Sequence, residues 1–345
     1  MKITRLLFFA LIFVVLSMLI SGCKGTQYTK VTNLNNDDSG PQNCIKGGHS
    51  FKNGKCIRCD ATFSDALEFE LSEDNNTYIV VNAENCKDKE VIIPAEYNGK
   101  AVSAIGESAF YYSSTLKKIN IPSTVEIIDD AAFHRCYNLE SVIFEENSRL
   151  FFIGEDAFLF CDKLAFINIP LGVENIGGEA FRSCFSLYEI ILPDDILHIG
   201  VDAFTGTGYY LDSDNWENGA LYIGNYLIKV NTSFSGRCNV KEGIKLLADE
   251  AFSGCYNLKS VDISSSVERI GKGAFASCSN LEYINFQYEN KLEKICEKAF
   301  KSCKSLLRIN YSKSKAEWED VTKDIDWDYQ TGNYIVHCTD GDIPK

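Results

Sequence analysis

The stretch Ile270-Gly271-Lys272-Gly273-Ala274-Phe275-Ala276-Ser277-Cys278 carries the pattern that decides the fold of this 345-residue chain. Its Ala-Phe pair recurs, with the phenylalanine at positions 110, 133, 158, 181, 204, 252, 275 and 300. The successive spacings are 23, 25, 23, 23, 48, 23 and 25 residues. Because 48 residues equal one unit of 23 and one of 25, one copy of the pair is missing within a divergent stretch. A period of this length is typical of a solenoid.

Other apolar residues keep a fixed distance from this landmark phenylalanine. An isoleucine or leucine stands five residues before each copy, and most copies have a leucine six residues after and further apolar residues nine and eleven residues after. The last two positions are two apart, which is the spacing of a strand with one face turned inward. The motif Gly-x-x-Ala-Phe-x-x-Cys has an apolar spacing of three, which suits a short helical or 3₁₀ corner.

A single unit of this kind cannot bury its own apolar face, so neighbouring units must stack and share a core. We therefore expect one right-handed, elongated array of short parallel β-strands with short helical or 3₁₀ corners and terminal caps. It should contain roughly nine or ten coils at about 4.8 Å each. The two 25-residue units carry their extra pair at 145–152 and 287–294. Such an insertion should enlarge one loop and leave the core register unchanged.

Six cysteines stand three residues after a landmark phenylalanine, at positions 136, 161, 184, 255, 278 and 303. A residue that recurs once per coil at one inward position predicts a column in the core, in which cysteine serves as a small apolar filler. Disulfides between adjacent coils are the alternative, although parallel side chains rarely offer the required torsion angle.

The N-terminus has the order of an export signal rather than of a membrane span. Lys2 and Arg5 precede an apolar run that ends in Ile20-Ser21-Gly22-Cys23, and a spanning helix needs roughly 20 apolar residues. The small residues before Cys23 resemble the bacterial lipobox, which implies cleavage after residue 22 and a diacylated Cys23. Because two acyl chains anchor a protein stably, we expect a lipoprotein on the outer face of a bacterial membrane. An ordinary signal peptide with a chance cysteine is the alternative.

The formal net charge is −14, and it becomes −16 when the two basic residues of the signal are removed. An acidic surface repels nucleic acid, so no nucleic-acid partner is expected. We expect a signal peptide at 1–22, a flexible stalk with the lipidated cysteine at 23–43 and a short Cys/His segment at 44–62. An N-terminal cap with the first coil follows at 63–101, then repeats at 102–311 with an irregular coil at 205–243, and a C-terminal cap at 312–345.

Tandem units such as Leu187-Tyr188-Glu189-Ile190-Ile191-Leu192-Pro193, in phase with the Ala-Phe motif, resemble the BspA-type leucine-rich repeat family of bacterial and protist cell-surface proteins. The resemblance extends from Val80 to the C-terminus, and residues 215–224 resemble an interruption that recurs in that family. It implies a leucine-rich-repeat solenoid that serves in surface display, adhesion or protein binding. It implies no catalytic residues.

Cys44, His49, Cys56 and Cys59 are the sharpest candidates for metal chemistry. Four soft ligands, two of them in a Cys-x-x-Cys pair, match the stoichiometry of a closed, structural zinc site. A disulfide or free thiols are the alternatives. The four histidines cannot be combined with a nucleophile in the sequence, and no Gly-x-Ser-x-Gly motif occurs, so we expect no enzyme activity.

Residues between the inward positions of each strand face outward in two rows, and exposed apolar and aromatic side chains there predict a binding surface. Unselected surface variation is the alternative. The expected partner is a protein or glycan of a host or neighbouring cell. Rival functions are a structural envelope lipoprotein without a specific ligand, and a metal-binding lipoprotein that uses the Cys/His segment. The candidate binding residues are Ile143, Phe166, Asn168, Ile191, Tyr283, Asn285 and Arg308.

Overall fold

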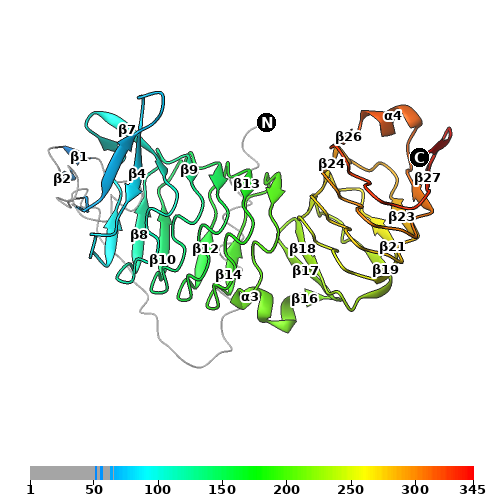
Figure 1. Ribbon diagram of the computed structural model, residues 1–345, viewed down its shortest axis with the longest axis horizontal. Helices are drawn as coiled ribbons and strands as arrows, with labels where there is room; N and C mark the ends of the chain where they lie inside the picture. The colour runs from blue at the N-terminus through cyan, green and yellow to red at the C-terminus, as the bar shows by residue number, and fades with distance from the viewer. Residues whose placement is uncertain (1–50, 53–54, 57–62, 65) are drawn as a thin grey trace, which may run out of the picture. The chain divides into compact units, whose positions relative to one another are not determined.

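The computed structural model describes residues 51–52, 55–56, 63–64 and 66–345, of which the first four contribute their backbone only. Within 66–345 the chain winds into stacked coils whose strands lie side by side (Figure 1). Strands of successive coils pair in parallel, and antiparallel pairs occur at the ends and in one central insertion. The chain is therefore a parallel-strand solenoid, as the period predicts.

Each coil contributes two strands rather than one. The longer strands stand at the predicted strand positions and are β5 (Glu90–Ile92), β8 (Lys118–Ile121), β10 (Ser141–Phe144), β12 (Phe166–Asn168), β14 (Glu189–Ile191), β19 (Ser235–Asn239), β21 (Asn257–Ile263), β23 (Tyr283–Phe286), β25 (Arg308–Asn310) and β27 (Ile335–Cys338). The second strands are mostly two residues long and are β4 (Tyr78–Asn82), β7 (Lys100–Ile105), β9 (Ile127–Ile128), β11 (Phe152–Ile153), β13 (Asn175–Ile176), β15 (His198–Ile199), β18 (Tyr226–Val230), β20 (Leu246–Leu247), β22 (Arg269–Ile270), β24 (Lys294–Ile295) and β26 (Thr322–Lys323).

Burial along the longer strands follows the predicted period of two. Ile284 pairs with Val261 on one side and with Ile309 on the other, and all three side chains are buried. The residues before them, such as Tyr283 and Arg308, are exposed. The period therefore separates core from surface, because successive side chains of a strand point to opposite faces.

The corner that carries the Ala-Phe pair is a run of turns, which corrects the expected helical or 3₁₀ corner. Residues two before and two after the landmark phenylalanine have positive φ, as in Ala131 at 53° and Arg135 at 62°. This alternation turns every second N–H toward the next coil, so that Ala131, Phe133 and Arg135 donate to its carbonyls at 2.7–2.8 Å. Positive φ outside glycine costs about 1–3 kcal/mol, which the hydrogen bonds between coils offset.

The landmark phenylalanines form a column of stacked rings in the core. Phe133 lies between Phe110 and Phe158, with ring centroids 5.0 Å apart on both sides and planes within 17°. The column continues to Phe204, and a second column joins Phe252, Phe275 and Phe300. All of these rings are buried, so the predicted core spine is confirmed. Offset stacking at this distance adds to the free energy that burial provides.

The predicted cysteine column in the core is also confirmed, and each of its thiols donates a hydrogen bond as well as filling space. Cys136 lies beside the preceding coil, and its Sγ donates to the Phe110 carbonyl at 3.1 Å. The other five repeat this bond to a carbonyl of the preceding coil. All ten cysteines of the described side chains are free thiols. A small donor at this position satisfies a buried carbonyl that would otherwise cost free energy.

The corner hydrogen bonds define eleven coils, more than the nine or ten expected. Three coils lack a landmark phenylalanine, and Ala83, Val230 and Asp328 take its place. The Ala83 and Val230 N–H groups donate to the following coil at 2.8 and 2.7 Å, as landmark residues do. Val230 therefore marks the coil that the 48-residue spacing leaves without an Ala-Phe pair.

A hairpin divides the core into two clusters. It consists of β17 (Ala220–Ile223) and β18, preceded by α3 (Gly208–Leu211), η1 (Ser213–Asn215) and β16 (Trp216–Glu217). Leu221, Ile223 and Ile228 pack into the first cluster, whereas Ala220, Leu227 and Val230 pack into the second. In the described residues no strand pairing joins β14 or β15 to the coils that follow. We call 66–204 the N-terminal half and 226–345 the C-terminal half.

Polar groups connect the two halves in place of a strand ladder. The Tyr226 hydroxyl donates to the Pro193 carbonyl at 2.5 Å and accepts from the Ile196 N–H at 3.0 Å. His198 Nε2 lies 2.9 Å from the buried carboxylate of Asp249. The Tyr226 hydroxyl thus satisfies backbone groups of a kind that neighbouring strands satisfy elsewhere in the stack.

The ends of the stack carry further short elements. At the N-terminal end are β1 (Phe51–Lys52), β2 (Lys55–Cys56), β3 (Glu68–Leu71) and β6 (Glu96–Tyr97). At the C-terminal end are α4 (Lys315–Asp320) and β28 (Gly341–Pro344). Trp318 on α4 and Trp327 pack with their ring centroids 6.1 Å apart. Trp327 also contacts Phe300 edge to face, and this contact ends the second ring column. Neither helix among the described residues has the length and apolarity to cross a bilayer.

The ring column predicts a large difference between two phenylalanines of the same coil. Phe158→Ala should lower the free energy of unfolding by about 3–5 kcal/mol, because it leaves a cavity between two stacked rings. Phe166→Ala should cost less than about 1 kcal/mol, because that ring is largely exposed. Urea denaturation followed by far-ultraviolet circular dichroism measures both values. Equal losses would contradict the column as the main source of packing energy.

The thiol column predicts slow alkylation. Burial raises the pKa of the Cys136 and Cys303 thiols to about 12. At pH 8 these groups are protonated and shielded, so iodoacetamide should modify less than roughly 5% of either in the folded chain. Peptide mass spectrometry measures the modified fraction, and the same reaction in concentrated guanidinium chloride should modify both fully. Rapid alkylation of the folded chain would show that the column is open to solvent.

Candidate functional site

The outward side chains of the longer strands form one surface on each half, which we call the strand face. The structure brings the seven candidate residues together in two groups rather than in one surface. The first group lies on β10, β12 and β14 and the second on β23 and β25, which belong to different sheets. The first group is Ile143, Phe166, Asn168 and Ile191, and the second is Tyr283, Asn285 and Arg308.

Strand pairing fixes the first group in space. Asn168 pairs with Ile191, and Phe166 pairs with Glu189, in the parallel register of β12 and β14. Phe166 is 43% exposed and Ile191 is similarly open, whereas Ile143 is half-buried. Large apolar side chains side by side on a regular strand surface are typical of interaction sites.

The sheet of the N-terminal half is interrupted between β10 and β12. β10 pairs with β8, and β12 pairs with β14, but no pairing within the described residues joins β10 to β12. The enlarged loop of the first 25-residue coil follows β10 directly. The core register is unchanged there, since β11 still pairs with β9 and β13. The second 25-residue coil keeps its ladder from β23 to β25, so loop length alone does not cause the break.

A recess of about 560 Å³ lies at this interruption, and we call it the strand-face groove. Its apolar lining includes Leu171, which is 81% exposed. Glu145 and Glu146 stand at its rim. An open apolar recess with an acidic rim suits a ligand with apolar side chains and positive charge, because opposite potentials favour association. The residues that define the groove are Ile143, Phe144, Phe166, Asn168, Pro170 and Leu171.

Of the second group, Asn285 belongs to a polar ladder whose members bond to one another. The Asn310 amide donates to Asn285 Oδ1 at 2.6 Å, and the Asn285 amide donates to Asp262 Oδ1 at 2.8 Å. Arg237 donates to the other oxygen of Asp262, and this bond raises the pKa of the arginine. Because these groups already bond to one another, they offer fewer free donors to a ligand than their number suggests.

The histidines of the described region show no catalytic arrangement with a nucleophile. His198 and His337 contact Asp249 and Asp342, and no hydrogen bond in the described region joins a histidine to a serine, threonine or cysteine side chain. Burial lowers the pKa of His134.

The metal and lipid predictions concern residues that the structure does not describe. Cys23, Cys44, His49 and Cys59 lie outside the described residues, and Cys56 contributes only backbone, on β2. The zinc site and the lipid anchor stay predictions. Among the described side chains, no cluster of three or more histidine, cysteine or acidic residues could hold a metal ion.

Sequence reasoning missed Leu171, Pro170 and Glu146 as parts of the groove. Pro170 and Leu171 follow β12 in the turn, and Glu146 stands in the enlarged loop after β10. The signal was the 25-residue spacing, which marks where a loop departs from the repeat. The spacing did not show that the neighbouring ladder also opens there.

Comparison with protein families gives one match, to the BspA type leucine-rich repeat region in six copies, over residues 83–211 and 208–321. The matched residues begin at the coil of Ala83 and end at α4, so they span almost all of the described coils. No curated protein sequence matches the chain significantly.

Solved structures of similar fold include bacterial leucine-rich repeat proteins. A leucine-rich repeat protein of T. pallidum is 22% identical, with a TM-score of 0.38, and the match covers 71% of this chain and 90% of that one. A leucine-rich cell surface protein of Faecalibacterium prausnitzii is 24% identical, with a TM-score of 0.37, over 79% and 94% of the two chains. A leucine-rich repeat protein of Bacteroides ovatus is 19% identical, with a TM-score of 0.34, over 79% and 98%.

Proposed function

The chain belongs to the BspA-type leucine-rich repeat family, and from that premise we propose that it is a non-catalytic binding protein, anchored by lipid at a bacterial cell surface. Its partner in this proposal is a protein of a host or neighbouring cell, bound in the strand-face groove. The observation that carries the proposal is the exposed apolar lining of that groove, which includes Phe166 and Leu171.

A protein ligand fits the groove better than a small molecule does. The recess is open along the interrupted sheet, so an extended segment can lie in it with its side chains against the apolar lining. The acidic rim and the acidic chain favour a segment with lysine or arginine beside its apolar residues. The contact should therefore weaken as salt concentration rises.

Rigid presentation supports binding without a conformational change. Phe166 and Asn168 are held by the ladder to β14, and their coil is fixed below by the ring of Phe158. A surface that is ordered before contact loses little conformational entropy on binding. The lipobox-like stretch that ends at Cys23 supplies the membrane attachment in this proposal.

The anchor is tested at Cys23. In a bacterial host, Cys23→Ala should abolish labelling with a palmitate analogue and leave the signal at 1–22 uncleaved, because the acylated cysteine marks the cleavage site. Cys86→Ala is a matched control, because Cys86 is a buried core thiol and should leave both readouts unchanged. Continued palmitate labelling of the Cys23 variant would reject the lipid anchor and leave the groove proposal intact.

The groove is tested by adhesion. Beads that carry the full chain should adhere to epithelial cells or to neighbouring bacteria, and the double variant Phe166→Ala, Leu171→Ala should reduce adhesion at least about tenfold. Tyr288→Ala is the matched control, because Tyr288 is exposed but does not line the groove. Circular dichroism should show unchanged folding for both. Equal adhesion of the double variant and the parent would favour a structural envelope role without a specific ligand at this groove.

A further inference from the structure

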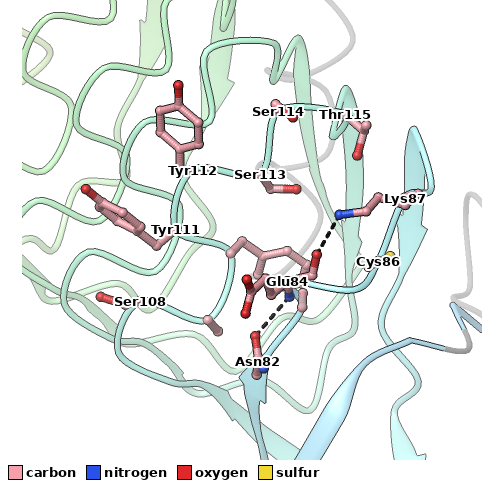
Figure 2. A pocket seen from close by; sticks show the side chains of 13 residues that line it. Asn82, Glu84, Cys86, Lys87, Ser108, Tyr111, Tyr112, Ser113, Ser114 and Thr115 are labelled. Atoms are coloured by element: carbon pink, nitrogen blue, oxygen red, sulfur yellow. Dashed lines mark hydrogen bonds between the residues drawn. The ribbon is translucent and has the colours of Figure 1, made fainter.

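A second recess lies at the corners of the first two coils. It shares no lining residue with the strand-face groove. Its volume is about 680 Å³. One wall is the corner turn at 108–115, and the other is the short turn at 82–87 in the first coil (Figure 2). We call it the corner pocket.

The first coil carries an alanine where later coils carry the landmark ring. Ala83 holds the landmark position, since its N–H donates to the Ala109 carbonyl at 2.8 Å as a landmark phenylalanine does in later coils. Phe110 therefore has a stacking partner only on the side of Phe133. Phe110 and Ala109 contribute to the pocket lining, but these two residues are only 1% and 2% exposed, so the apolar surface that a ligand can reach comes from Tyr111 and Tyr112.

The first coil also leaves a backbone acceptor open. In the next coil the N–H of Tyr112 donates to the His134 carbonyl at 2.9 Å, and the same bond recurs at Arg135 and Phe160. The equivalent acceptor of the first pair of coils is the Tyr111 carbonyl, and no hydrogen bond in the described region reaches it. A ligand that donates hydrogen bonds can satisfy this group.

Two tyrosines at the pocket are exposed but held in position. Tyr111 is 48% exposed and contacts the His134 ring edge to face at 5.3 Å, while Tyr112 is 55% exposed and contacts Tyr137 at 5.8 Å. These contacts come from the next coil, so the rings are oriented before a ligand arrives. The electron-rich face of such a ring attracts the polarised C–H groups of a sugar ring.

The polar lining matches a hydroxylated ligand. Ser108, Ser113, Ser114 and Thr115 contribute hydroxyls, which both donate and accept hydrogen bonds. Lys87 donates to the Glu84 carbonyl at 2.8 Å, and the Glu84 N–H donates to Asn82 Oδ1 at 2.9 Å, so this wall is ordered (Figure 2). The lining contains one ammonium, on Lys87, and one carboxylate, on Glu84, so the pocket carries no net charge.

We propose that the corner pocket is a binding site for a neutral pyranose sugar of a glycan. The sugar stacks its apolar face on Tyr111 or Tyr112, and its hydroxyls bond to the serine and threonine hydroxyls and to the Tyr111 carbonyl. A peptide fits less well, because the walls are turns that present hydroxyls, whereas peptide recognition by strand addition needs an open strand edge. An anionic sugar is disfavoured by the acidic chain.

The test is binding of the full chain to a printed array of neutral oligosaccharides of glucose, galactose, mannose and N-acetylhexosamines, with sialylated and sulfated forms beside them. Positive glycans are then titrated by saturation-transfer NMR. A monosaccharide should bind with a dissociation constant on the order of 1 mM, and a longer glycan more tightly. Animal-type and bacterial or plant glycans occupy separate sections of the array, so the section that binds identifies the source. Binding to none, or only to anionic forms, overturns the proposal.

Two variants place the site. Ala83 is buried, so Ala83→Phe should overpack the core beneath the 82–87 wall, displace that wall and abolish glycan binding. Tyr111→Ala with Tyr112→Ala should weaken binding at least about tenfold without filling the core, which keeps the test open if Ala83→Phe folds poorly. Tyr256→Ala is the matched control, because this exposed corner tyrosine lies in the C-terminal half. Unchanged glycan binding in the tyrosine double variant rejects the corner pocket. The adhesion test on the strand-face groove is independent of this result.

Discussion

The contact between the landmark residue of one coil and the next coil is the interaction on which the rest of the structure depends. Phe133 shows its three parts: its ring stacks between two others, its N–H donates to the Ala157 carbonyl, and its own carbonyl accepts from the Cys161 thiol. Each part reaches only a neighbouring coil. Stability therefore accumulates by nearest-neighbour contacts, and a coil removed from the stack would lose most of what holds it.

Much of this arrangement is written in the spacing of apolar residues. The 23-residue interval and the period of two predicted parallel strands, a buried ring spine and an inward cysteine column, because these depend on which side chains repeat in phase. The corner conformation was not predictable in this way. Ala131 and Arg135 have no intrinsic preference for positive φ. They adopt it because this conformation turns N–H groups toward the next coil, which supplies the acceptors. The sequence did not predict the coils centred on Ala83 and Val230, because hydrogen bonds rather than residue type mark their landmark positions.

The candidate site was predictable in part, for the same reason. Alternation along the strands placed Phe166, Asn168 and Ile191 outward, and strand register then brought them together. Two other facts depend on contacts that no local pattern reports. The ladder opens between β10 and β12, and the hairpin separates the first group of candidate residues from the second. Asp262 shows the limit most clearly, because its outward position is buried by Arg237 and Asn285.

The central hairpin has a further consequence for how the molecule loses its structure. In a uniform stack, melting that begins at one end spreads from coil to coil without a natural stopping point. Here the ring column and both strand ladders end at the hairpin. The two halves are joined by side-chain hydrogen bonds such as those of Tyr226, by one backbone bond from the Asp249 N–H to the Ile199 carbonyl, and by apolar packing of Leu246 and Ala248 in the first core cluster. The hairpin is thus a boundary at which unfolding that begins at one terminus can stop, so that the two halves unfold as separate cooperative blocks.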